Sequence, residues 1–174
     1  MEFTHFKDRA EAGAQLARQL MAYADNEHVI VLALPRGGVP VGDAIARALH
    51  APLDVLLVRK LGAPGHEEYA LGAIASGGVR VLQQAAVNKL HLTPAAVQQI
   101  IDREQGELER RERLYRAGAA APRLAGRIVI LADDGLATGA TMRVAIEAVR
   151  HQKPARLVVA VPVAAPDARD RVGA

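Results

Sequence analysis

Four apolar segments constrain the fold of this chain more than any other feature. They read HVIVLAL (28–34), PLDVLLV (52–58), RIVILA (127–132) and RLVVAVPVA (156–164). Short, nearly uninterrupted runs rich in β-branched residues are typical of strands buried on both faces. Helices are expected before the first of these segments, over residues 8–24, and between them, over residues 39–50, 93–116 and 138–151. This alternation predicts an α/β fold, an open and mostly parallel sheet with helices on both faces.

The middle of the chain differs from this pattern. The segment YALGAIASGGVRVL (69–82) predicts one or two short strands around Gly77 and Gly78. Thr93 and Pro94 form a strong helix start, with a capping hydroxyl followed by proline. The helix after them is very polar, and its expected apolar stripe is Val97, Ile101, Leu108 and Tyr115. At 174 residues, the chain is expected to be a single domain over residues 1–174.

Composition excludes several classes of function. Aromatic residues make up 3% of the chain and the net charge is only +3, so a nucleic-acid partner is not expected. The absence of cysteine removes disulfides, thiolate nucleophiles and cysteine-ligated zinc. No signal pattern precedes the first expected helix, and no apolar run is long enough to cross a membrane. A cytoplasmic protein is the default expectation.

Polar chemistry follows three of the expected strands: Pro35-Arg36-Gly37-Gly38, Arg59-Lys60 and Asp133-Asp134. Ligands of open α/β sheets bind beyond the carboxyl ends of the strands. We therefore expect these three strand ends to lie on one edge of the sheet and to form a ligand site.

The stretch DDGLATGATM, which begins at Asp133, combines two acids with a glycine- and threonine-rich loop that leads into a helix. Free amides at a helix start bind phosphate, and Thr138 and Thr141 add hydroxyl donors. Adjacent carboxylates can accept hydrogen bonds from vicinal hydroxyls. A ribose 5-phosphate therefore fits the whole stretch, with its hydroxyls at the two acids and its phosphate at the loop. The alternative is an ordinary strand-to-helix turn in which Asp134 or Thr138 caps the helix.

The same stretch resembles the phosphoribosyl-diphosphate binding motif of the type I phosphoribosyltransferases. Most of residues 3–163 resemble phosphoribosyltransferases of unassigned substrate, through FKDRAEAGAQLARQL, VLALPRGGVPVGDAIARAL, PLDVLLVRKLGAPGHEEYALGAIASGG, ERRERLYRAG and VILADDGLATGATM. The resemblance implies a parallel core sheet with a hood. It also implies Mg²⁺-dependent displacement at the anomeric carbon of phosphoribosyl diphosphate, with pyrophosphate leaving, in nucleotide metabolism.

The resemblance implies roles for individual residues. Asp133 and Asp134 would hold the ribose hydroxyls, directly or through Mg²⁺ and water. The 5-phosphate would be wrapped by Ala137, Thr138, Gly139, Ala140 and Thr141. Pyrophosphate would be bound by Pro35, Arg36, Gly37, Gly38, Arg59 and Lys60, and a flexible loop, Arg59 to Gly72, would close over the site. Catalysis would rest on Asp133, Asp134, Arg36 and Lys60.

Elementary chemistry supports these roles independently. Breaking a glycosidic bond gives an oxocarbenium-like transition state that favours nearby carboxylates, while the departing pyrophosphate needs cations. Ala137 stands where the 6-oxopurine branch commonly has an aspartate, so the acceptor base stays open. The chain stops soon after the fourth expected strand, so the hood is expected to be incomplete. The alternative is therefore a non-catalytic regulatory domain that binds phosphoribosyl diphosphate or nucleotides. The family often dimerises, and a homodimer is expected.

Overall fold

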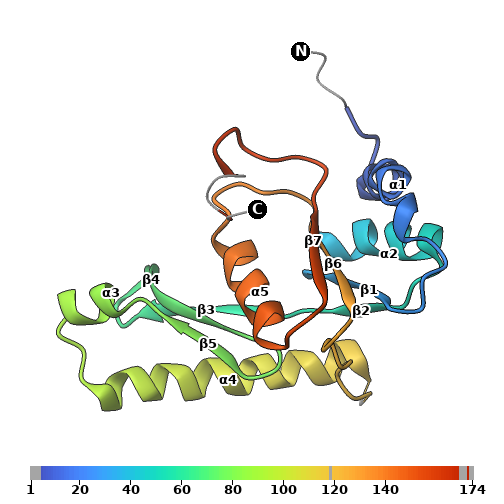
Figure 1. Cartoon of the computed structure of the whole chain (residues 1–174). Helices are drawn as coiled ribbons and strands as arrows, with labels where there is room; N and C mark the ends of the chain where they lie inside the picture. The colour runs from blue at the N-terminus through green and yellow to red at the C-terminus, as the bar shows by residue number, and fades with distance from the viewer. Residues whose placement is uncertain (1–4, 118, 169–171, 173–174) are drawn as a thin grey trace. The chain divides into compact units, whose positions relative to one another are not determined.

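The computed structural model describes residues 5–117, 119–168 and 172, and for residues 66–70 it describes the backbone alone. The chain divides into two compact units. Unit 1 comprises Met1–Leu56 and Pro122–Ala174, and unit 2 comprises Leu57–Ala121. Figure 1 draws unit 2 in green and yellow and unit 1 in blue, orange and red. The single domain expected from the sequence stays a prediction.

Unit 1 contains a parallel sheet with the strand order β2-β1-β6-β7. Its strands are β1 (Val29–Ala33), β2 (Leu53–Val55), β6 (Ile128–Ala132) and β7 (Arg156–Ala160). All neighbouring pairs are parallel, and every residue of β1 is buried. The runs 28–34 and 127–132 therefore became the central strands β1 and β6 for the expected reason, since both of their faces are covered, while β2 and β7 are the edge strands.

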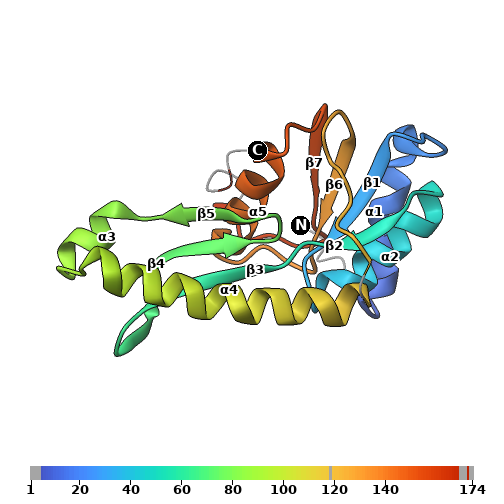
Figure 2. The ribbon, with the colours of Figure 1, turned by 90° about the horizontal axis from the view of Figure 1, so that it is seen from below.

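The helices of unit 1 cover both faces of this sheet. They are α1 (Arg9–Gln19), α2 (Gly38–Leu49) and α5 (Ala140–His151), with a short 3₁₀ helix, η1 (Met21–Tyr23). From the central pair β1 and β6, the crossover through α2 leads outward to β2 and the crossover through α5 leads outward to β7. Because crossovers are right-handed, opposite directions place α2 and α5 on opposite faces, as Figure 2 shows. The predicted fold class is confirmed.

The outer helix α1 lies very close to α2 at one glycine. A Cβ on Gly13 would lie 2.6 Å from the carbonyl oxygen of Val41 and 2.8 Å from Cβ of Ala44. Only a residue without a side chain allows the two backbones to approach so far. Beside this contact, Ala17, Val41 and Ile45 join the buried core of unit 1.

Unit 2 contains an antiparallel sheet with the order β3-β4-β5 and two helices. Its elements are β3 (Val58–Ala63), β4 (His66–Ala75), β5 (Val79–Leu82), α3 (Gln84–Lys89) and α4 (Pro94–Arg116). The expected strands around Gly77 and Gly78 are confirmed. The expected stripe of α4 is correct except for Tyr115, which is 44% exposed; Ile100 is buried instead.

One prediction about strand ends is wrong. The run 52–58 does not form one strand, because β2 ends at Val55 and the chain enters unit 2 after Leu56. Arg59 and Lys60 lie inside β3, where they pair with Ile74 and Ala73 of β4. They therefore do not follow the carboxyl end of a strand of the parallel sheet, and the expected flexible loop from Arg59 to Gly72 is a β-hairpin in the described backbone.

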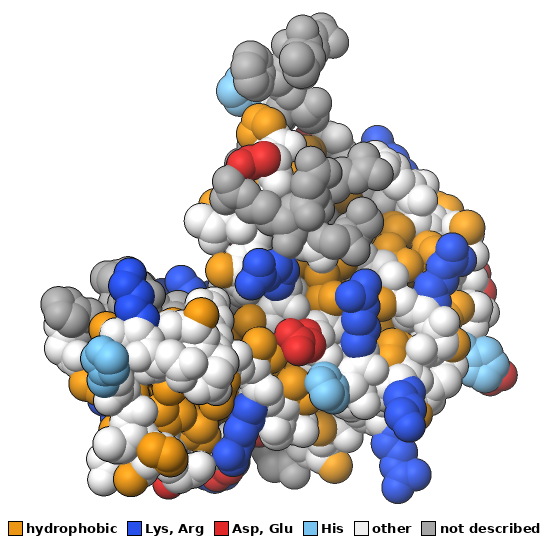
Figure 3. All heavy atoms as spheres, turned by 60° about the vertical axis from the view of Figure 1, so that its left-hand side comes forward, with side chains coloured by type: hydrophobic (Ala, Val, Ile, Leu, Met, Phe, Trp, Pro, Cys, Tyr) orange, Lys and Arg blue, Asp and Glu red, His pale blue; other side chains and the backbone are white. Residues whose placement is uncertain are grey.

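Unit 2 also carries an apolar surface groove. Leu82 is 40% exposed, and beside it lies a cavity of about 400 Å³. Figure 3 shows apolar side chains gathered in this part of the surface. The cavity is lined by Leu82, Gln84, Val87, Asn88, Leu92, Pro94, Val97, Gln98 and Ile101.

Candidate functional site

The candidate site lies at the topological switch point of unit 1. The crossovers leave the central strands β1 and β6 in opposite directions, which opens a crevice beyond their carboxyl ends. Pro35–Gly38 follows β1 and Asp133–Gly139 follows β6. Ligands of open α/β sheets bind in the crevice at such a point. Two of the three predicted strand ends therefore meet at one edge, as expected.

The two loops are packed directly against each other. A Cβ on Gly37 would lie 2.0 Å from Oδ2 of Asp134, and one on Gly38 would lie 2.7 Å from the carbonyl oxygen of Ala132. The backbone N–H of Leu34 also donates to the Ala132 carbonyl at 2.9 Å, which extends the β1–β6 ladder into the loops. A side chain at Gly38 would therefore collide with the backbone after β6, and one at Gly37 would displace the Asp134 carboxylate. The Pro35–Arg36 peptide bond in this loop is cis.

Asp133 is half-buried and has no cationic partner among the described residues. Its Oδ1 accepts the backbone N–H of Asp134 at 2.8 Å. Burial raises the pKa of Asp133 to about 6, the backbone hydrogen bond opposes this, and the neighbouring Asp134 carboxylate adds to it. A bound cation or a hydroxyl donor would reverse this cost of burying the charge.

Asp134 has a different environment. Nε and Nη2 of Arg9 each lie 2.8 Å from its Oδ2. A cavity of about 270 Å³ opens beside this ion pair, and both apolar and charged side chains line it. Its lining residues are Phe6, Asp8, Arg9, Ala12, Asp134, Pro162 and Val163. Sequence reasoning missed Arg9, because it lies 125 residues before its partner.

The loop after the acids has the features of a phosphate cradle. Gly139 caps α5 with a left-handed backbone, φ 74°, and contributes no side-chain hydrogen bond to the helix start. Ala137, Thr138, Ala140 and Thr141 are exposed. The Thr138 hydroxyl accepts the Ala140 N–H at 3.4 Å, a long contact that a stronger acceptor could replace. Exposed hydroxyls therefore lie at the amino end of α5, where a helix favours a bound anion.

The remaining predicted cations fall into two groups. Arg36 is exposed in the loop after β1, and no ion pair of it is found among the described residues. Arg59 and Lys60 belong to unit 2, where Glu104 of α4 accepts Nε of Arg59 at 2.9 Å and also bonds its Nη2. Glu104 is buried and Lys60 is exposed. Arg59 is thus committed to a structural ion pair, which sequence spacing did not reveal.

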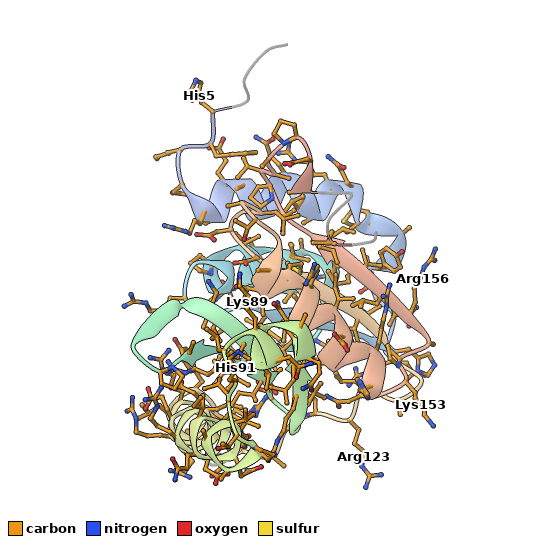
Figure 4. All side chains as sticks on the ribbon, turned by 90° about the vertical axis from the view of Figure 1, so that its left-hand side faces the viewer. His5, Lys89, His91, Arg123, Lys153 and Arg156 are labelled. Atoms are coloured by element: carbon orange, nitrogen blue, oxygen red, sulfur yellow. The ribbon has the colours of Figure 1, made fainter. Side chains whose placement is uncertain are left out.

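Other basic side chains of unit 1 lie at the far end of the sheet. Figure 4 labels Arg123, Lys153 and Arg156, which stand before β6 or at the start of β7. Arg156 lies over the ring of Tyr23 at 5.9 Å. The acids follow the opposite ends of these strands, so these cations do not belong to the candidate site.

The donor set suits a magnesium ion that is shared with a phosphorylated ligand. Mg²⁺ is usually held by one or two carboxylates together with substrate phosphates and water. Asp133 offers a half-buried carboxylate without a cationic partner in the described part of the chain. Among the described residues there is no cluster of three or more metal-ligating side chains, so an all-protein cage is not formed there.

Comparison with known proteins identifies the family of the chain. The profile of the phosphoribosyl transferase domain family matches residues 2–174. A Mycobacterium tuberculosis H37Rv protein, provisionally named a phosphoribosyl transferase, is 46% identical over 162 residues. The match covers 93% of this chain and 36% of that protein, so the chain spans about a third of its curated relative. No helix among the described residues is long and apolar enough to span a membrane.

Two solved structures have a similar fold. The crystal structure of TT1426 from Thermus thermophilus matches with a TM-score of 0.82 and 44% identity, covering 98% of this chain and 80% of that one. The purine phosphoribosyltransferase of Pyrococcus horikoshii shares the fold, with a TM-score of 0.54 and 17% identity, covering 95% and 78%. The sequence-based resemblance is confirmed: the chain belongs to the phosphoribosyl transferase domain family.

Proposed function

We propose that this protein is a phosphoribosyltransferase that transfers ribose 5-phosphate from phosphoribosyl diphosphate to a nitrogenous base. One observation carries the proposal: Asp133 and Asp134 meet the Pro35–Gly38 loop at the switch point of the parallel sheet. Carboxylates, a phosphate-binding helix start and a glycine loop then lie at one edge of the sheet. The family membership supports the same reaction class.

In the proposed reaction, the bond between the anomeric carbon and the pyrophosphate oxygen breaks, and its electron pair leaves with pyrophosphate. A nitrogen of the acceptor forms the new bond to that carbon, and the proton of that nitrogen is released to the departing pyrophosphate or to water. Asp133 and Asp134 hold the ribose hydroxyls and stabilise the positive charge that develops on the sugar. Ala137–Thr141 binds the 5-phosphate, and Arg36 with the amide of Gly37 binds the leaving group. The Gly38 N–H does not take part, because it donates to the Leu34 carbonyl at 3.0 Å.

A bound Mg²⁺ would supply further charge neutralisation to the pyrophosphate, with Asp133 and Asp134 as its protein ligands, directly or through water. A role of Lys60 as a second cation for the leaving group stays a prediction from the family resemblance, since Lys60 belongs to unit 2. Glu104 holds the Arg59 guanidinium, so Lys60 is the better candidate of the two for binding the leaving group.

A cytoplasmic location, a role in nucleotide metabolism and a homodimer stay predictions. Size-exclusion chromatography with light scattering would check the homodimer.

The test is a panel of purine and pyrimidine bases incubated with phosphoribosyl diphosphate and Mg²⁺, with pyrophosphate release as the readout. Base-dependent release is expected. The double variant Asp133→Asn with Asp134→Asn should lose both release and binding while keeping a wild-type circular dichroism spectrum. Tight binding without release, for every base, would instead favour the non-catalytic regulatory domain. Unchanged affinity in the double variant would contradict the assignment of the site.

A further inference from the structure

Arg9 contacts the acid motif although it belongs to neither of the loops that form the site. It is the first residue of α1, and its Nε and Nη2 both lie 2.8 Å from the same oxygen, Oδ2 of Asp134. Arginine is the side chain best suited to hold a carboxylate in one orientation, because its donors have a fixed geometry. The contact therefore orients the Asp134 carboxylate in addition to neutralising its charge.

The start of α1 is itself fixed in place. Asp8 caps the helix by accepting the Glu11 N–H at 2.8 Å, which sets where the first turn begins. Further along, Gly13 allows α1 to approach the backbone of α2 at Val41. Since α2 begins at Gly38, in the loop packed against the acids, Arg9 and the acids are both positioned relative to the same helix.

Asp134 is held from a second side as well. The Cα of Gly37 lies so close that an added Cβ would be 2.0 Å from Oδ2 and 2.8 Å from Oδ1. With Oδ2 occupied by both Arg9 donors, Oδ1 keeps its acceptor capacity for a ligand. Arg9 also places a positive charge beside two adjacent carboxylates, which reduces their mutual repulsion.

We propose that Arg9 is a positioning residue for substrate binding: it holds Asp134 with Oδ1 available to a ribose hydroxyl of phosphoribosyl diphosphate. This inference rests on the proposed function. A purely structural role would be weak here, because the side chains of Arg9 and Asp134 are 60% and 34% exposed, and exposed ion pairs contribute little to stability. A large loss of affinity without a matching loss of stability therefore separates the two roles.

The experiment is isothermal titration of Mg²⁺-phosphoribosyl diphosphate into wild type, Arg9→Gln, Arg9→Lys and the control Arg18→Gln. Arg18 is also on α1 and exposed. We expect Arg9→Gln to weaken binding at least about tenfold, the scale of a lost charge-assisted hydrogen bond. Arg9→Lys should restore part of this loss, and Arg18→Gln should match wild type. The unfolding temperature of Arg9→Gln should change by less than about 4 °C.

A double-variant cycle tests whether Arg9 acts through its partner. In an Asp134→Asn background, Arg9→Gln should cause no further loss of affinity, because the carboxylate that it orients is gone. An equal loss in both backgrounds, or wild-type affinity in Arg9→Gln, would overturn the role of Arg9 while leaving the proposed function standing. Failure of the wild-type protein to bind Mg²⁺-phosphoribosyl diphosphate would overturn the proposed function and this inference with it.

Discussion

Replacing Asp133 by asparagine should stabilise the protein while removing its ligand affinity. Asp133 is half-buried after β6, and no cationic partner is found for it in the described part of the chain. Asparagine has nearly the same shape, and its Oδ1 can still accept the Asp134 N–H that now lies at 2.8 Å. The substitution therefore isolates the cost of burying one negative charge.

The magnitude follows from the pKa of this carboxyl, which burial raises from 3.8 to about 6. At roughly 1.4 kcal/mol per unit the full shift corresponds to about 3 kcal/mol. Water still reaches a half-buried group, so we expect about 1–2 kcal/mol. Between pH 4 and 6, roughly, the folded state binds the proton more tightly than the unfolded state does. The contribution of Asp133 is therefore most favourable below its unfolded pKa and is lost as the pH rises through its folded pKa.

Urea unfolding of wild type and Asp133→Asn at about pH 7.5, 6 and 4.5 measures this difference. The variant should be more stable by about 1–2 kcal/mol near pH 7.5, and most of the difference should be gone by about pH 4.5. Glu147→Gln, an exposed acid of α5, is the control and should show no comparable gain. A variant no more stable than wild type at the highest pH, or a difference independent of pH, would refute the reasoning.

Three further predictions concern other parts of the chain. Gly37→Ala should reduce affinity for Mg²⁺-phosphoribosyl diphosphate at least about tenfold in titration calorimetry, because the added Cβ would displace the Asp134 carboxylate. Its control is Gly106→Ala on α4, where the added Cβ meets nothing, and this variant should bind as wild type does. Glu104→Gln should lower the free energy of unfolding by about 1–3 kcal/mol in urea, because its half-buried arginine partner loses its counter-charge. Thr138→Val combined with Thr141→Val should weaken binding by about 2–4 kcal/mol if both hydroxyls bind the 5-phosphate; unchanged affinity in the same calorimetry would contradict the cradle.

The parallel sheet could be predicted because its signal is local. Val29–Ala33 and Ile128–Ala132 are apolar throughout, and a strand buried on both faces needs no alternation. The run 52–58 shows the limit of this signal. Only Leu53–Val55 pairs with β1, and Leu57 after it enters the core of unit 2. A buried position requires an apolar residue both in β2 and in the core of unit 2, so the sequence alone could not show where β2 ends.

The site was predictable where it is contiguous in sequence and was missed where it is not. Pro35–Gly38 and Asp133–Thr141 each follow a strand directly, so sheet topology brings them together. Arg9 comes from a helix expected only for its apolar face, and nothing in its spacing points to Asp134. The commitment of Arg59 to Glu104 likewise depends on how α4 packs on β3, a long-range contact that no local pattern encodes.

The two adjacent acids illustrate what the fold adds to the motif. In sequence Asp133 and Asp134 are equivalent, yet they meet opposite environments: burial raises the pKa of Asp133, while Asp134 is paired with Arg9. If both carboxylates were ion-paired with protein cations, the pair would attract a further cation only weakly. A pair with neither neutralised would repel itself. Here Asp134 is paired with Arg9, while Asp133 has no cationic partner among the described residues. This arrangement suits the proposed ligand, which brings hydroxyl donors together with a cation.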